Sequence, residues 1–578
     1  MSDYSSDDEA EDVHRDPITH RPLNPRRILF EPVIGRVVDA LGGYEAGVYR
    51  MGDEVSGCLK DLKKLWRKDD TDDERTVARI FWEKRVLSKD LIPILLMTAG
   101  AGQVEDKRAI ACADLISAMT WPIDMSEELA ELDSGERADF TQLHAAHRSY
   151  KAAVLQPAVI QALFAIILPP LAKIPKERSL RDNQVAALVL YIVRNLAAIR
   201  DRDGLQSRLL TTLRDNHLFE LILTAASNSE KDPLLGSWNT LILEILFLLF
   251  RGTPPMSLID QPKPALERLL AAEARAAPVP TSRHSRFGTS IVVSANPKAT
   301  TQAVVHTTAP VPFLLDANKK RVRVRAVESA DAIYADDLTI EALSVLRGSA
   351  RDFLSEGVFN AFLTALLRDI KMERSWATGD RIGIWTLAVV RWTTCFFLLD
   401  TKVKKRDFGL VGAAVESGFV SWVLKRMREA SEEKPVGWPA MFAGMGCLTQ
   451  ILSVLDAIAS PTSGATESDA DAAQTLTMQL IYAGAPLDLA MDCLRACTTA
   501  KAAGRGPAFL DAAVHFAYSL VRMLERQAST GDSVYVRKAK SSAKKGNAED
   551  ETQYAEEEER RRAKEEQEQT FSLDSFEM

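Results

Sequence analysis

The residues best suited to charged or stacking contacts lie in one segment, residues 277–335. This segment holds eight Lys or Arg residues against three Asp or Glu residues, a charge of +5 in a chain of net charge −8. Cationic side chains on an extended backbone neutralise phosphates, and an aromatic ring among them stacks on bases. The segment is therefore predicted to bind nucleic acid or a partner, through Arg283, His284, Arg286, Phe287, Gly288, Lys319, Lys320, Arg321, Arg323 and Arg325.

The two ends of this segment differ in kind. In "RHSRFGTS" Gly288, which follows Phe287, permits a backbone conformation that other residues cannot adopt. This indicates a short motif that becomes ordered when it packs on another surface. In "KKRVRVR" the alternation places Arg321, Arg323 and Arg325 on one edge of an extended strand, all able to face phosphates. Two other interpretations stay open: a nuclear-import signal at residues 319–325, or a solvated linker.

A second basic cluster follows near the end of the chain. It precedes the run "AEEEERRRAKEEQEQ", which is typical of a charged helix or a disordered tail. Its members are Arg537, Lys538, Lys540, Lys544 and Lys545.

The sequence predicts no catalytic, metal or cofactor site. It has no GxSxG elbow, GxxxxGK[ST] loop or HExxH helix. His144 and His147 lie near each other without a third ligand, and Cys493 and Cys497 are also alone, so all four are expected to be core or surface residues. The six cysteines show no CxxC pair, which favours a reducing compartment.

The elements that carry these residues are helices. A 3.6-residue apolar period begins near residue 24 and hardly stops, and Gly, Pro, Asn or Asp separate stretches of ~12 to 20 residues. Asp182 is a plausible N-cap, and Asp69 and Asp70 fit a solvated turn. One expected core stripe comprises Val185, Leu188, Val189, Ile192, Val193 and Leu196; another comprises Leu510, Ala513, Val514, Ala517, Val521 and Leu524.

No run alternates with period two over a length that would build a sheet, so the chain is expected to be all-α. So many helices with short connections favour an α-solenoid of HEAT/armadillo-like helix pairs with a long basic loop insertion, although no repeated residue signature is visible. Residues 382–399 are nearly long enough to span a bilayer, but Arg391 interrupts them, so we expect a buried helix and no membrane span.

Five regions follow from these patterns. They are an acidic disordered tail over residues 1–23, the N-terminal part of the solenoid over 24–276, the basic flexible loop over 277–335, the C-terminal part of the solenoid over 336–529, and a charged tail, expected to be disordered, over 530–578.

Several stretches together resemble the Timeless family, whose fungal members include a topoisomerase I-associated, or swi-type, subunit of the fork protection complex. The loop motif "SRHSRFGTSIVV" stands between helical stretches in the family's order: "VIGRVVDALGGYEAGVYRMGDE", "LSKDLIPILL", "YIVRNLAAIR", "LEILFLLFRG" and "FLDAAVHFAYSLVRMLER". The resemblance runs from about residue 27 to the end and covers the N-terminal part of what the family usually has. We therefore expect a fragment of a longer protein.

The resemblance implies a non-enzymatic nuclear scaffold without cofactors. It implies association with a Tipin-like small subunit, the replicative helicase, a Claspin-like mediator, duplex DNA and topoisomerase I, with roles in fork pausing, checkpoint signalling and cohesion. A nuclear helical-repeat adaptor or transport scaffold unrelated to replication is the alternative, and an enzyme with an unrecognised site is a weaker one.

Overall fold

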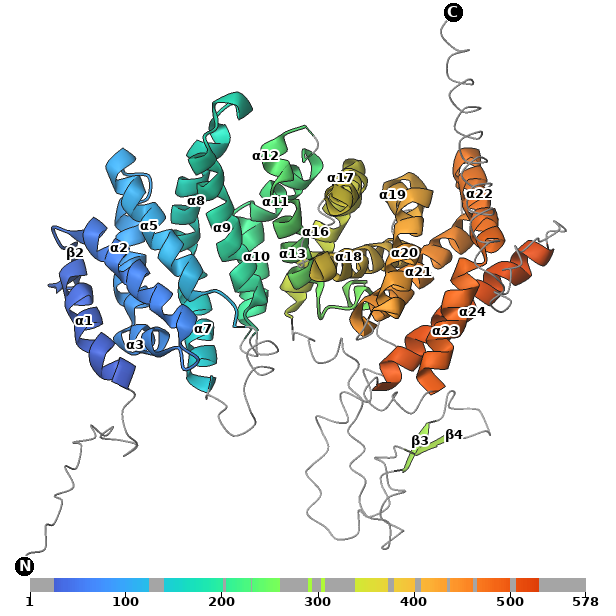
Figure 1. Cartoon of the computed structure of the whole chain (residues 1–578), viewed down its shortest axis with the longest axis horizontal. Coiled ribbons are helices and arrows are strands. Elements are labelled where there is room, and N and C mark those ends of the chain that lie inside the picture. Colours follow the sequence, from blue (N-terminus) through green and yellow to red (C-terminus); the bar gives the residue numbers. More distant parts are fainter. Residues whose placement is uncertain are drawn as a thin grey trace, which may run out of the picture.

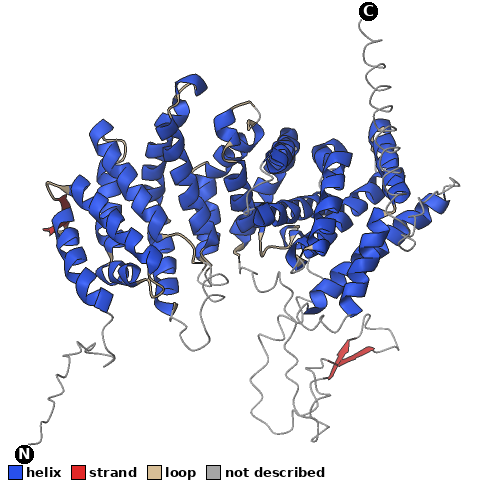
Figure 2. Cartoon of the chain, viewed as in Figure 1, coloured by secondary structure: helices blue, strands red, loops and turns tan. Residues whose placement is uncertain are grey.

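The computed structural model describes residues 25–123, 140–200, 204–229, 231–259, 290–293, 303–306, 338–372, 379–400, 407–433, 437–460, 465–498 and 506–529. Within these residues the protein is an array of stacked helices that runs from α1 (Pro25–Leu41) at one end to α24 (Gly506–Ser529) at the other (Figure 1). Helix dominates the described chain (Figure 2), which confirms the predicted all-α solenoid.

The helices before the long loop are α2 (Val55–Trp66), α3 (Thr76–Lys84), α4 (Ile92–Thr98), α5 (Gln103–Met119), α7 (Thr141–Val154), α8 (Pro157–Ala172), α9 (Leu180–Ala198), α10 (Leu205–Asp215), α11 (Leu218–Ser227), α12 (Pro233–Gly236) and α13 (Asn239–Phe250). Those after it are α16 (Ile340–Leu354), α17 (Val358–Met372), α18 (Gly379–Leu399), α19 (Gly412–Val415), α20 (Ser417–Glu432), α21 (Trp438–Ile458), α22 (Glu467–Ala483) and α23 (Ala485–Thr498).

The start of helix α9 is determined by the residues at its N-terminus. Ser179, not Asp182, is the N-cap: the Ser179 hydroxyl accepts from the Asp182 backbone N–H, and the Asp182 carboxylate accepts from Ser179 N, which completes a capping box. The prediction therefore placed the cap three residues too late. The expected stripe is confirmed, since Val185, Val189 and Ile192 are among its buried members.

Among the described residues, two short hairpins of four-residue strands accompany the helices. β1 (Gly42–Glu45) pairs antiparallel with β2 (Val48–Met51), where "LGGYEAG" was interpreted as a simple helix break. Gly42 has φ +147°, and a Cβ there would lie 2.2 Å from the Arg50 carbonyl oxygen, so the pairing requires glycine. The second hairpin joins β3 (Ser290–Val293) and β4 (Ala303–His306).

The helices before and after the long loop share one hydrophobic core. Phe250 of α13 stacks on Trp392 of α18 with 4.1 Å between ring centroids, and the indole N–H of Trp392 donates to the Thr253 carbonyl at 2.7 Å. The backbone N–H of Thr339 donates to Ser207 Oγ at 2.9 Å. Residues far apart in sequence thus hold the array together across the insertion.

Helices α18 and α21 are both long and apolar enough, by length and composition, to cross a membrane, and each is at least half buried inside the protein. Arg391, in the middle of α18, lies against Gly446 of α21, where an added Cβ would be 2.8 Å from Arg391 Cδ. The glycine leaves room for a charged side chain between two apolar helices. The expected absence of a membrane span remains a prediction.

Two polar predictions near the N-terminal end resolve differently. Asp69 is buried in the short 3₁₀ helix Arg67–Thr71 and accepts from the N–H groups of Val77 and Ala78 at 2.8 and 2.6 Å. The solvated-turn interpretation is wrong for Asp69, because its carboxylate caps the start of α3. Asp70 is exposed.

The two histidines of α7 are a surface and a core residue, as predicted. His144 is exposed and His147 is buried.

Candidate interaction site

The predicted binding residues lie outside the described part of the chain. This holds for Arg283 to Gly288, for the basic run at residues 319–325 and for the second cluster at residues 537–545. The hairpin β3–β4 is described, with Ser290 paired to His306 and Val293 paired to Ala303. The motif "TSRHSRFGTSIVV" therefore ends in a strand, inside a segment expected to be a flexible loop.

Helix α24 presents its faces differently from the prediction. Ala513 is buried as expected, but Leu510, Val514 and Val521 are exposed. The buried residues are Phe509, Ala513, Phe516 and Leu520, which pack toward α21 and α23. The helix thus has two apolar stripes, and the bulkier one faces the core.

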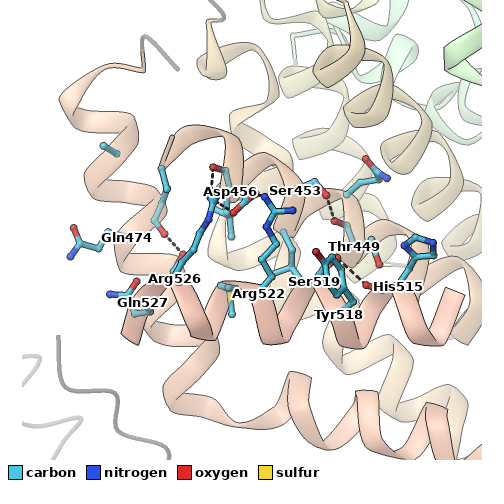
Figure 3. A pocket seen from close by; sticks show the side chains of 18 residues that line it. Thr449, Ser453, Asp456, Gln474, His515, Tyr518, Ser519, Arg522, Arg526 and Gln527 are labelled. Carbon is cyan, nitrogen blue, oxygen red and sulfur yellow. Dashed lines mark hydrogen bonds and ion pairs between the residues drawn. The ribbon is translucent and has the colours of Figure 1, made fainter. Parts of the chain in front are cut away.

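A groove of about 520 Å³ lies between α24 and α22, with α21 along its floor (Figure 3). Small and hydroxyl-bearing residues line much of it. Thr449 and Ser453 of α21 donate to their own helix at Met445 O and Thr449 O, both at 2.8 Å, and Ser519 of α24 donates to His515 O at 2.9 Å. These three hydroxyl protons are already used within their helices, so the three hydroxyl oxygens face the groove mainly as acceptors.

The charged centre of the groove is a carboxylate shared by two arginines (Figure 3). Arg522 Nη2 lies 3.4 Å from Asp456 Oδ2, Arg526 forms an ion pair with the same carboxylate, and Arg526 Nη1 donates to the Asp456 carbonyl oxygen at 3.0 Å. Both arginine side chains are more than 40% exposed. Two cations on one anion leave a net positive charge that an incoming carboxylate can meet.

This groove was not predicted from the sequence. Arg522 and Arg526 are one helical turn apart in "VRMLER", so their placement on one face was readable. Asp456 is far away in sequence and gave no sign that it faces them, because that contact depends on how α24 crosses α21. Among the described residues no group of three or more His, Cys, Asp or Glu side chains is placed to hold a metal ion.

Comparison with known proteins finds similarity to one family model and to several fungal proteins that share one name. Residues 48–293 match the family model described as Timeless protein. The chain is 35% identical to topoisomerase 1-associated factor 1 of Cryptococcus neoformans var. neoformans serotype D, over 89% of this chain and 51% of that protein. The proteins of the same name from Emericella nidulans and Aspergillus niger are 26% and 28% identical, over 89% and 88% of this chain and 48% and 47% of theirs.

The chain spans about half the length of the curated relatives that it matches. The family match ends at Val293, the last residue of β3, and so includes the "SRHSRFGTSIVV" motif. Residues 48–293 are thus similar to the Timeless family, and the chain as a whole is similar to the fungal proteins named topoisomerase 1-associated factor 1.

Proposed function

We propose that the chain is a non-enzymatic scaffold of the replication fork protection complex and acts in the nucleus. The observation that carries the proposal is the Timeless match over residues 48–293, which includes the basic loop motif in its place between helices. A long helical array offers an extended surface for several partners at once, which is how solenoids commonly work. The resemblance supports a Tipin-like subunit, the replicative helicase and a Claspin-like mediator as those partners.

The relatives' name points to a further partner. Proteins that are 26–35% identical to this chain carry the name topoisomerase 1-associated factor 1. From that name we propose that this chain also associates with topoisomerase I. The match covers about half of those proteins, so the topoisomerase-binding region has to be sought in both halves of a full-length relative.

Duplex DNA is the proposed ligand of the loop. The loop, residues 277–335, carries a charge of +5, which is opposite in sign to the net charge of −8 of the whole chain. Cationic side chains on an extended backbone are suited to contact the phosphates of DNA. Reversing Arg283, Arg286, Arg321 and Arg323 to Glu, in the chain purified with its small partner, is expected to weaken duplex binding. The slope of log affinity against log salt should also become shallower, because fewer counterions are released.

Charge reversal of Lys538, Lys540, Lys544 and Lys545 changes as many positive charges in the second basic cluster and shows which of the two predicted clusters contacts DNA. If only the loop variant loses affinity and slope, the loop is the DNA contact. Unchanged affinity and slope in the loop variant would remove the loop from DNA binding.

Co-purification separates this function from that of a general nuclear adaptor. Helicase subunits and a Tipin-like protein should be recovered with the tagged chain from replicating cells. Recovery of transport factors in their place would favour the adaptor.

A further inference from the structure

One exposed face of α24 is unusually apolar. Leu510, Val514, Tyr518 and Val521 recur at helical spacing and are 48%, 50%, 60% and 59% exposed; we call them the α24 face. A row of large apolar side chains on the last described helix therefore indicates a surface that another segment covers.

We propose that residues 570–578 of this chain, "TFSLDSFEM", dock on the α24 face. These nine residues contain Phe571, Leu573, Phe576 and Met578. They follow a run, residues 556–569, in which eleven of fourteen residues are Glu, Arg or Lys and which contains no large apolar residue. Such a sudden return of aromatic and aliphatic side chains after a charged run is typical of a segment that buries them against a surface.

The tether between the two is long enough. Residues 530–569 connect the end of α24 to the segment, and a forty-residue linker that behaves as a random coil has a root-mean-square span of roughly 35 Å. Helix α24 itself, at 24 residues, is about 36 Å long. The segment can therefore reach any point along the α24 face, and the tether raises its effective concentration there to about the millimolar range.

The charges of the two surfaces are complementary. Asp574 and Glu577 are the ionisable residues of the segment, and both are acidic. Tyr518 belongs to the α24 face and also lines the groove, so the face adjoins the groove in which Arg522 and Arg526 share Asp456. A docked segment can thus bury its aromatic side chains on Val514, Tyr518 and Val521 while a carboxylate meets the excess positive charge.

Photo-crosslinking in the full chain tests the proposal. Benzoylphenylalanine is placed at Phe576, the purified protein is irradiated, and crosslinked peptides are mapped by mass spectrometry. The expected product is intramolecular and joins residue 576 to residues 510–526. The double variant Val514→Asp/Val521→Asp should reduce that product at least tenfold, and its helical circular dichroism and melting temperature should stay unchanged, because both side chains are at least half exposed.

Tyr554 provides the matched control position, since it lies on the same tail outside the segment. Benzoylphenylalanine at Tyr554 should give little crosslinking to α24. Three outcomes would overturn the proposal: an intermolecular product at residue 576, which would mean that a second copy covers the face; crosslinks from residue 576 to other helices or to none; or crosslinking that survives the Val514→Asp/Val521→Asp change.

Discussion

Arg522 and Asp456 face each other across the crossing of α24 and α21, with Nη2 of the arginine 3.4 Å from Oδ2 of the aspartate. Arg526 binds the same carboxylate one turn further along α24. This single acidic side chain therefore fastens the C-terminal turns of α24 to the helix beneath and leaves one positive charge in excess in the groove.

Removing that carboxylate should loosen the end of α24. In Asp456→Ala both guanidinium groups lose their shared anion, so amide hydrogen exchange over residues 518–529 should quicken while exchange in α21 changes little. Asp492→Ala is the control, because the Asp492–Arg495 pair on α23 is well exposed and contributes little. Equal effects of the two changes would contradict the role of Asp456.

His147 should make the fold sensitive to acid. Its burial lowers the pKa of the imidazole from 6.5 to about 4, so between these values the unfolded chain binds a proton that the folded chain does not. Stability is therefore lost as the pH falls from about 6.5 to about 4. His147→Gln should remove roughly 2 to 4 kcal/mol of that loss, measured by urea unfolding at a series of pH values.

The pH slope, rather than absolute stability, is the quantity to compare, because the substitution also changes packing. His144→Gln, on the same helix, should flatten the slope much less than His147→Gln, because the charge of His144 is a smaller cause of the lowered pKa of His147 than burial is. A His147→Gln slope identical to that of the unchanged protein would show that this residue does not set the acid response.

Lys151 is fully buried, and its ammonium group donates to the Ile199 carbonyl and to Gln206 Oε1, both at 2.8 Å. Lys151→Met keeps most of the volume but leaves two buried acceptors without this donor. We expect a loss of about 3 kcal/mol in the free energy of unfolding. The exposed pair of Lys173 with Asp182 gives the comparison, and Lys173→Met should cost less than about 1 kcal/mol.

Gly446 admits the Arg391 side chain between α18 and α21. A Cβ at this position would lie 2.8 Å from Arg391 Cδ and 3.0 Å from its Nε, so Gly446→Ala should destabilise the fold by about 1–3 kcal/mol despite the better helix propensity of alanine. In α2 an added Cβ on Gly57 meets nothing within 4 Å, and Gly57→Ala should stabilise by up to about 1 kcal/mol. Thermal unfolding of both variants measures the difference, and a stabilising Gly446→Ala would contradict this packing.

The helical array was predictable because the 3.6-residue apolar period depends only on local sequence. The period did not tell which stripe of α24 would face the core: Val514 and Val521 fit the pattern, yet Phe516 and Leu520 pack inward. Choosing between two apolar stripes requires the neighbouring helices, which a single segment does not specify. Asp69 was misassigned for a related reason, since its capping contacts lie eight and nine residues ahead.

The candidate groove was less accessible to sequence reasoning than the loop. A local excess of charge, such as the +5 of residues 277–335, can be counted along the chain. The groove arises where α21, α22 and α24 meet, and its residues are separated by up to about eighty positions. Only tertiary packing brings Asp456 beside Arg522.

The central claim is that this protein works at replication forks, and recovery of proteins on newly made DNA tests it most directly. Cells are given a short pulse of a labelled nucleotide, and proteins crosslinked to labelled DNA are collected at once or after a chase with unlabelled nucleotide. The account predicts that the protein is enriched with helicase subunits in the pulse sample and falls to background after the chase. Equal recovery in both samples, or none in the pulse, would contradict it.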